Sequence, residues 1–106
     1  MSLGGSANSA LDKAVNSLAN IGVHVAVAAG NSGLPASFFS PARAAAAITV
    51  AASDITDTYP SWSNWGLRVA MIAPGQDIIS SWNTHDTVHR FYCVLYHSLT
   101  ISSGNE

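Results

Sequence analysis

The chain has 106 residues, a formal net charge of −2 and 9% charged residues, against about 25% in an average domain. A hydrophobic content of 48% argues against intrinsic disorder, and the four Lys and Arg residues argue against a nucleic-acid surface. The sequence has no uninterrupted apolar run of about 18 residues, so it predicts no transmembrane helix. The single cysteine excludes an intrachain disulfide. We therefore expect one α/β unit with a modest core.

The first five residues contain two adjacent glycines, Gly4 and Gly5. Glycines let another chain approach the backbone closely, so residues 1–5 could pair with an extended peptide. The alternative is an ordinary glycine turn that leads into a helix.

Residues 6–20 predict a helix. Asn8 or Ser9 can cap its start, and Gly22 is placed to end it. One apolar stripe at helical spacing would face the core, formed by Leu11, Ala14, Val15 and Leu18.

Residues 23–27 form a continuous apolar run, which predicts a strand buried on both faces, as in a parallel sheet. His24 interrupts the run, and we interpret it as a hydrogen-bonded core histidine rather than a catalytic base. Residues 28–30 are small and leave room for another backbone. Asn31 follows at the carboxyl end of the strand, where open α/β sheets bind ligands.

Residues 32–41 read as a loop, in which Phe38 and Phe39 are by default core side chains. The alanine run at 42–47 is compatible with a helical turn or with an extended segment. Residues 47–52 predict the next strand.

A polar turn at residues 54–60 contains two carboxylates, Asp54 and Asp57. No third ligand has a spacing that suits a metal ion, so we interpret this segment as a solvated turn. Two further strands are predicted, one within 69–75 that ends at a Pro-Gly pair and one at 77–82.

Taken together, five short motifs occur in an order that resembles the subtilisin-like serine proteases, in particular the fungal proteinase K type. They are Ser-Leu-Gly-Gly at 2–5, Val-Ala-Ala-Gly-Asn at 27–31, Ser-Trp-Ser-Asn-Trp-Gly at 61–66, the Ala-Pro-Gly strand at 69–75 and Asp-Ile-Ile-Ser-Ser-Trp at 77–82. The resemblance implies a truncated α/β fold, part of a three-layer subtilisin-like domain with a mainly parallel sheet. Residues 1–87 would be the central part of the peptidase domain, and residues 88–106 a tail that does not resemble the family.

The resemblance also implies roles for particular residues. Asn31 would donate a hydrogen bond to the oxyanion; an asparagine that caps its own turn is the alternative. Phe38 and Phe39 would shape the far wall of the primary specificity pocket. The substrate backbone would bind along an edge formed by Ser2, Leu3, Gly4 and Gly5. The walls of the pocket would be formed by small residues, namely Ala28, Ala29 and Gly30.

The family's three catalytic motifs, which carry its aspartate, histidine and serine, do not occur in the sequence. No motif supports a substitute triad built from His85, His89 or His97 with Ser98, Ser102 or Ser103. We therefore expect a serine endopeptidase by family, in a chain that is inactive alone. The alternatives are a non-catalytic peptide-binding module and a structural α/β fragment.

We expect no metal or other cofactor. Ala70 stands where the resemblance places a calcium-binding aspartate, and its methyl group cannot coordinate a hard cation. The expected partner is a peptide or protein substrate, with no nucleic acid and no membrane. Uncovered apolar surface would favour self-association. By family, the parent protein would be secreted or vacuolar.

Overall fold

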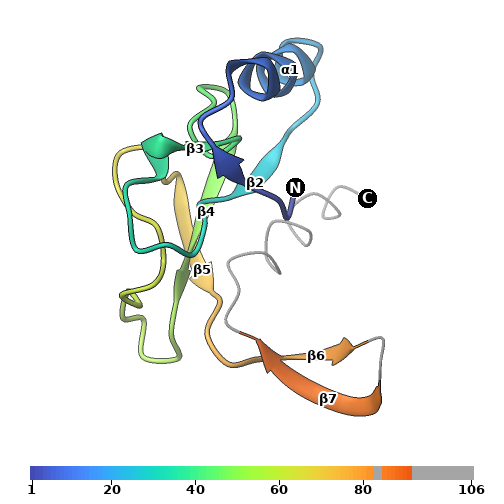
Figure 1. The fold of residues 1–106 in the computed structure, drawn as a ribbon, viewed down its shortest axis with the longest axis vertical. Helices are drawn as coiled ribbons and strands as arrows, with labels where there is room; N and C mark the ends of the chain where they lie inside the picture. The colour runs from blue at the N-terminus through green and yellow to red at the C-terminus, as the bar shows by residue number, and fades with distance from the viewer. Residues whose placement is uncertain (83–84, 92–106) are drawn as a thin grey trace.

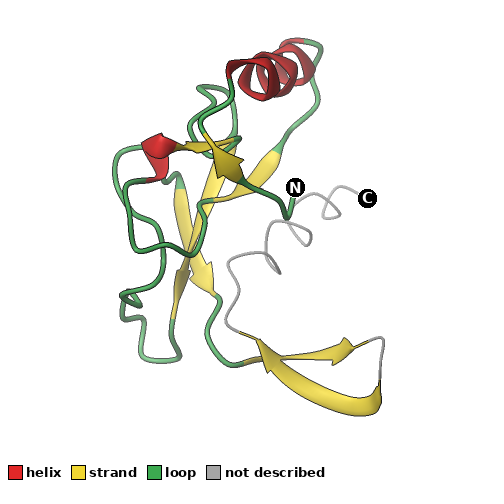
Figure 2. Ribbon diagram, viewed as in Figure 1, coloured by secondary structure: helices red, strands yellow, loops and turns green. Residues whose placement is uncertain are grey.

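The structure is a computed structural model that describes residues 1–82 and 85–91 (Figure 1). In these residues one α-helix accompanies a small parallel sheet and two short antiparallel strand pairs (Figure 2). In chain order the elements are β1 (Gly5–Ser6), α1 (Ser9–Asn20), β2 (Ala26–Ala28), the 3₁₀ turn η1 (Ala36–Phe38), β3 (Phe39–Ser40), β4 (Ile48–Ser53), β5 (Met71–Pro74), β6 (Ile78–Trp82) and β7 (His85–Phe91).

The central sheet has the strand order β2-β4-β5, and its strands are parallel. Val27 pairs with Thr49, and Ala51 pairs with Ile72. Parallel neighbours require crossover connections, which are typical of α/β proteins. The predictions of an α/β fold and of a mainly parallel sheet are confirmed.

Helix α1 begins at Ser9, later than predicted, because the residues before it belong to other structure. Ser6 pairs with Phe39 across the β1–β3 ladder, so the predicted start at residue 6 is wrong. The Asn8 side chain caps the helix and accepts hydrogen bonds from two amides of the first turn, at 3.0 and 3.2 Å.

The predicted apolar stripe of α1 is only partly buried. Val15 is 1% exposed and packs with Val25, Val27 and Ala44. Leu18, however, is 41% exposed. The helix therefore contacts the core of the described residues mainly through Val15.

The segment between α1 and β2 corrects two expectations. Strand β2 begins at Ala26 rather than at residue 23, and the buried run begins at Val25. His24 precedes both and is exposed, so its interpretation as a core histidine is wrong. Gly22, at φ +91°, turns the chain at the end of the helix, and the next two residues cross open surface before the chain enters the sheet.

Alanines supply much of the core beside the end of β2. One buried cluster consists of Ala28, Ala29, Ala36, Ala42, Ala51 and Ala52, with Phe39, Tyr59, Trp62 and Val69 packed against it. Side chains this small allow neighbouring backbone segments to approach closely. The alanine run at 42–47 forms hydrogen-bonded turns, in which the amide of Ala44 donates to Pro41 and that of Ala47 donates to Ala44.

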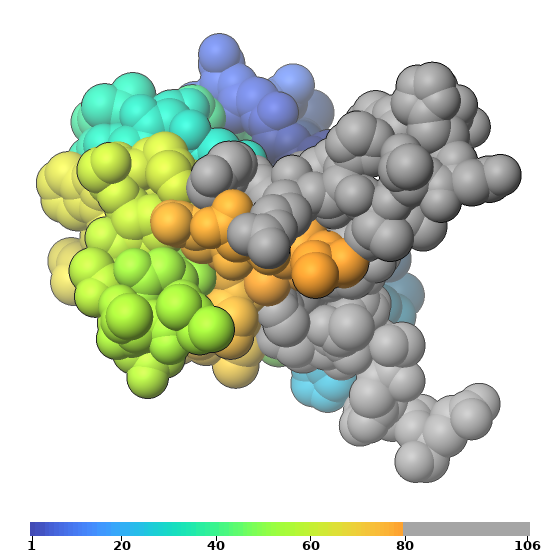
Figure 3. Space-filling model, turned by 90° about the horizontal axis from the view of Figure 1, so that it is seen from below, coloured from blue at the N-terminus to red at the C-terminus, as the bar shows by residue number. Residues whose placement is uncertain are grey.

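The turn at residues 54–60 is organised by its first carboxylate. Asp54 Oδ1 accepts hydrogen bonds from the Thr56 hydroxyl at 2.7 Å and from the amides of Thr56 and Thr58 at 2.8 Å. The bonds from Thr56 and Thr58 hold the pKa of Asp54 below its usual value. The turn lines a hollow of about 590 Å³ together with residues between 74 and 79. Figure 3 shows the face of the molecule on which this turn lies, in lime green.

Strands β6 and β7 pair antiparallel, with Ile78 opposite Phe91. The pair lies at the end of the molecule opposite α1 (Figure 1). Strand β7 crosses the predicted boundary at residue 87, and residues 92–106 lie outside the described part of the chain. The division into 1–87 and a tail at 88–106 stays a prediction. In the part that the structure describes, no helix is long and apolar enough to cross a membrane.

An ion pair joins α1 to the turn after β3. Arg43 Nε lies 2.5 Å from Asp12 Oδ2, and the two side chains are 34% and 13% exposed, respectively. Burial by itself raises the pKa of the Asp12 carboxyl, but its hydrogen bonds and the charge of Arg43 outweigh this effect. The pKa of Asp12 therefore lies below the usual 3.8.

We expect Asp12→Asn to lower the free energy of unfolding by about 0.5–1 kcal/mol near neutral pH, because Arg43 loses its charged partner while water partly screens the pair. Since folding lowers the pKa of Asp12, its contribution is present above the usual 3.8 and is lost as the pH falls through the folded-state pKa. Urea unfolding of both forms across this acid range measures the effect. Asp57→Asn, in an exposed turn, is the control. A loss that does not shrink in acid would contradict the ion-pair origin.

Candidate active site

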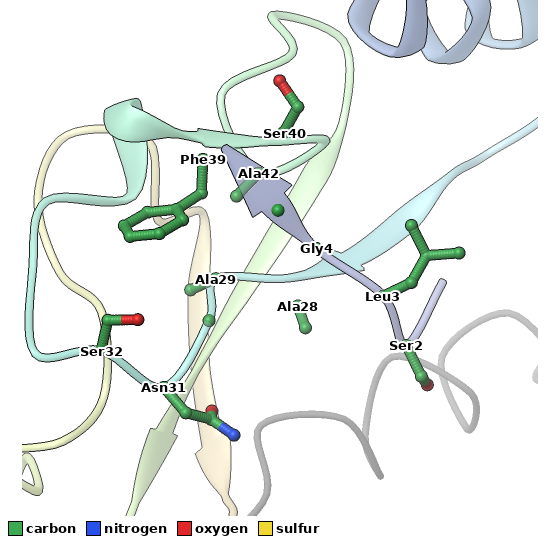
Figure 4. A pocket seen from close by; sticks show the side chains of 12 residues that line it. Ser2, Leu3, Gly4, Ala28, Ala29, Asn31, Ser32, Phe39, Ser40 and Ala42 are labelled. Carbon is green, nitrogen blue, oxygen red and sulfur yellow. The ribbon is translucent and has the colours of Figure 1, made fainter. Parts of the chain in front are cut away.

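A pocket of about 410 Å³ opens beside the carboxyl end of β2 (Figure 4). The predicted oxyanion residue and the predicted substrate-binding residues line it, namely Ser2, Leu3, Gly4, Gly5, Ala28, Ala29, Gly30 and Asn31. Ser32, Phe39, Ser40 and Ala42 complete the lining. The structure thus brings together two segments that the sequence separates by more than twenty residues.

The first segment is held at both of its ends. The amide of Ala28 donates to the carbonyl of Met1 at 3.2 Å, and Gly5 pairs with Ser40. Residues 5 and 6 form strand β1, so the segment is not the helix-initiating glycine turn considered as an alternative. Between these contacts Leu3 is 51% exposed, and the edge that it belongs to lines the pocket.

Asn31 follows Gly30 at the end of β2 and is exposed. Within the described residues its carboxamide makes no hydrogen bond. Figure 4 shows this carboxamide extending outward from its loop rather than folding back onto it. An asparagine that capped its own turn would instead accept a hydrogen bond from an amide of that turn. The oxyanion role of Asn31 stays a prediction.

A different carboxamide, that of Asn64, caps the loop that carries Asn31. Asn64 Oδ1 accepts from the amide of Ser32 at 2.9 Å and from that of Leu34 at 3.1 Å. Its Nδ2 donates to the carbonyl of Ala29 at 2.9 Å, and its backbone amide donates to that of Gly30, also at 2.9 Å. Asn64 is 0% exposed, and its bond to Ala29 is buried, whereas its bonds to Ser32 and Leu34 are partly buried.

The turn that carries Asn64 is itself fixed by two hydroxyl groups. The Tyr59 hydroxyl donates to the carbonyl of Asn64. Burial raises the pKa of this phenol, which keeps it protonated as a donor. Ser63 Oγ accepts from the amide of Ala52 in β4 at 3.0 Å. The turn at 61–66 is therefore attached to both the loop and the sheet.

Gly30, which precedes Asn31, packs against the Asn64 side chain, and it can do so only because it has no side chain itself. Its φ is +106°, and a Cβ at this position would lie 2.4 Å from Asn64 Nδ2. Gly33, at φ +64°, is similarly close to the carbonyl of Ser61. The two glycines let the loop approach the Asn64 turn closely.

The opposite wall comes from β3 and the turn that follows it. Phe39 lines the pocket and packs against the alanine core, whereas Phe38 is 60% exposed and does not line the pocket. The sequence patterns did not indicate Ser32, Ser40 and Ala42 as lining residues. Ser40 could have been predicted as a lining residue, because it follows the predicted wall residue Phe39 directly in the sequence.

Among the residues that the structure describes, no ionisable side chain lines this pocket. Within residues 1–82 and 85–91, no three His, Cys, Asp or Glu residues are grouped so that they could hold a metal ion. The amide of Ala70 donates to Thr49 at 2.8 Å, and its side chain offers only a methyl group. The described residues around Ala70 do not fit a calcium ion, and the absence of a cofactor stays a prediction.

None of the residues considered for a substitute triad is among those that line the pocket in the described part of the chain. His85 and His89 belong to β7, of which only the backbone is described. His97, Ser98, Ser102 and Ser103 lie outside the described residues.

Strand β2, the loop after it and the pocket define an α/β protein with a pocket at the carboxyl end of a strand, where proteins of this class bind ligands. The model of the subtilase family (peptidase S8) matches residues 1–102. This match covers most of the chain, which therefore belongs to the subtilase family, as its motifs predicted. The match extends beyond residue 87, the predicted end of the peptidase segment. The predicted boundary itself is not tested by the comparisons.

Individual relatives agree with this assignment. An extracellular serine proteinase of Thermus sp. (strain Rt41A) is 54% identical over 87 residues, which cover 82% of this chain and 21% of that protein. Proteinase T of Parengyodontium album is 48% identical over 83 residues, which cover 78% of this chain and 28% of that protein. The chain thus spans between a fifth and a third of the length of these relatives.

Solved structures show the same fold. A cold-adapted subtilisin-like serine proteinase superposes with a TM-score of 0.85 at 34% identity, and the match covers 99% of this chain and 41% of that one. A protease from Pseudoalteromonas arctica superposes with a TM-score of 0.79 at 23% identity, which supports the fold alone.

We expect Gly30→Ala to destabilise the chain more than Gly22→Ala. Both glycines have positive φ, +106° and +91°, so an alanine at either position adds backbone strain of about 1–2 kcal/mol. A Cβ at Gly22 meets no atom within 4 Å, whereas one at Gly30 collides with Asn64. Denaturant unfolding of the two variants compares these costs. Equal losses would mean that Asn64 moves aside without a measurable cost.

Proposed function

We propose that this chain forms the oxyanion-binding and substrate-binding part of a serine endopeptidase. The observation that carries the proposal is the Asn31 carboxamide, exposed and without a hydrogen bond in the described residues, at the rim of a pocket on a loop that Asn64 fixes. A donor held in this way can bind the negative oxygen that forms when a nucleophile attacks a peptide carbonyl.

Residues 2–5 would bind the backbone of an extended peptide beside the scissile bond. One peptide side chain would enter the pocket between this edge, residues 28–30 and Phe39. Since the lining carries no charge and includes Leu3 and the Phe39 ring, an apolar side chain would be favoured.

In the reaction, a serine attacks the carbonyl carbon, a histidine takes the serine proton, and an aspartate orients the histidine. The family motifs for these three residues do not occur in the 106 residues, so we assign them to another part of the complete protein. Asn31 Nδ2 would donate to the oxyanion of the tetrahedral intermediate, a stronger interaction than with the uncharged carbonyl of the substrate.

A second candidate is a module that binds peptides without cleaving them. It is favoured by one observation: the described residues line a pocket, although the sequence contains none of the three catalytic motifs. Saturable binding of an extended peptide without turnover by the 106-residue chain would support this candidate.

We further propose that the complete protein is secreted and acts on protein substrates. The support is the family assignment and the relative from Thermus, which is named as extracellular. A vacuolar location and self-association through exposed apolar side chains stay predictions.

We expect Asn31→Ala to lower kcat by about 10²–10³-fold with little change in KM, as is typical when an oxyanion donor is removed. The test uses a complete subtilase into which residues 1–87 of this chain are grafted, here called the grafted protease. Asn16→Ala, which removes a carboxamide outside the pocket lining, is the control. A rise in KM at unchanged kcat would contradict the oxyanion role.

We expect the 106-residue chain alone to hydrolyse peptides no faster than buffer. Oxyanion stabilisation has nothing to act on when no nucleophile forms a tetrahedral intermediate. The check is amidase activity across a gel-filtration profile, with a triple Ser98→Ala, Ser102→Ala, Ser103→Ala variant alongside. Activity that co-elutes with the chain and disappears in the triple variant would show that the chain carries its own nucleophile.

A further inference from the structure

We propose that Asn64 is the positioning residue for Asn31, and that it acts on the reaction only through that neighbour. The proposal rests on the function proposed above, because it explains how the oxyanion donor is held. Asn64 is 0% exposed, so it cannot itself contact a substrate in the pocket.

The bonds of Asn64 lie on both sides of Asn31 in the sequence. Before Asn31, Asn64 donates to the carbonyls of Ala29 and Gly30. After it, Asn64 accepts from the amides of Ser32 and Leu34. Asn31 lies between these contacts, and within the described residues its own carboxamide is unbonded. The loop is thus held on both sides of a side chain that remains available to a ligand.

The chemistry of the amide group explains why an asparagine suits this position. A carboxamide has an acceptor oxygen and a donor nitrogen, so one side chain satisfies two loop amides and one loop carbonyl. A carboxylate would lose the donor toward Ala29, and an alkyl side chain would leave all three backbone groups without this partner.

The position of Asn31 affects turnover more than substrate binding. An oxyanion donor acts in the transition state, and a displacement of about 1 Å in a catalytic group can cost about 10²-fold in rate. Loosening the Asn64 contacts should therefore lower kcat while KM changes little. A purely structural role would instead reduce the fraction of active molecules and leave kcat per active site unchanged.

The first experiment needs no catalysis. Hydrogen exchange of the 106-residue chain is compared between the parent and Asn64→Ala. We expect the amides of Ser32 and Leu34 to exchange about tenfold faster or more in the variant, because both lose their acceptor, while amides of β4 change less than about threefold. Tyr59→Phe, which removes only the hydroxyl bond to the Asn64 carbonyl, should produce a smaller change at the same two amides.

Asn16→Ala is the matched control. Asn16 Oδ1 also accepts from the amide of a distant loop residue, Ala46, at 3.0 Å, but neither residue lines the pocket. It should leave exchange at Ser32 and Leu34 unchanged. Fast exchange of these two amides in the parent chain, or equal effects of Asn16→Ala and Asn64→Ala on them, would overturn the proposal.

The second experiment measures kcat per titrated active site in the grafted protease. We expect Asn64→Ala to lower kcat about 10- to 100-fold in the parent, and about threefold or less in an Asn31→Ala background, because the two residues act through one donor. Equal effects in both backgrounds would overturn the positioning role. If Asn31→Ala alone leaves kcat unchanged, the proposed function fails, and hydrogen exchange still decides whether Asn64 holds the loop.

Discussion

Where the chain leaves strand β2, it passes from a core of alanines into a partly exposed turn, whose backbone groups still need hydrogen-bond partners. The Asn64 carboxamide supplies three of them from within the protein. A buried amide without a partner costs about 1–3 kcal/mol, so the turn and the Asn64 segment stabilise each other. The pocket depends on this contact, because residues 29–32 line it.

Neutral side chains also satisfy backbone groups at other positions in the described residues. This use of neutral rather than charged partners is consistent with the small number of charged residues in the chain. Ser40 Oγ accepts from the amide of Asn8 at 2.8 Å, Thr49 Oγ1 donates to the carbonyl of Ala42 at 2.7 Å, and the side chain of Ser63 accepts from β4. In each case a short neutral side chain satisfies a loop or strand backbone group. Short side chains also keep the segments close, so small residues serve both the packing and the hydrogen bonding of this core.

Local sequence patterns predicted those features that depend on residues adjacent in the sequence. The continuous apolar runs predicted the parallel strands, and the motif at 27–31 placed Asn31 at a strand end. His24 was misjudged because its apolar neighbours indicated burial, whereas burial depends on where the chain enters the sheet. The role of Asn64 could not be predicted in this way, because its partners lie about thirty residues earlier in the chain. The late start of α1 has a similar cause, since Ser6 pairs with distant Phe39.

The arrangement of the pocket separates two kinds of chemistry in the proposed reaction. Backbone groups, small side chains and the carboxamides of Asn31 and Asn64 form much of the pocket and of the loop contacts beside it, and none of these groups titrates near neutral pH. In the proposed reaction, the affinity of such a surface for a peptide backbone, and its affinity for a developing oxyanion, would each change little over a wide pH range. The proton transfers of peptide hydrolysis need titratable groups, which the resemblance places on motifs that do not occur in this sequence. In the grafted protease, the pH dependence of turnover would therefore arise from those groups, while residues 2–5 and 28–31 would set which peptide binds and how strongly its transition state is stabilised.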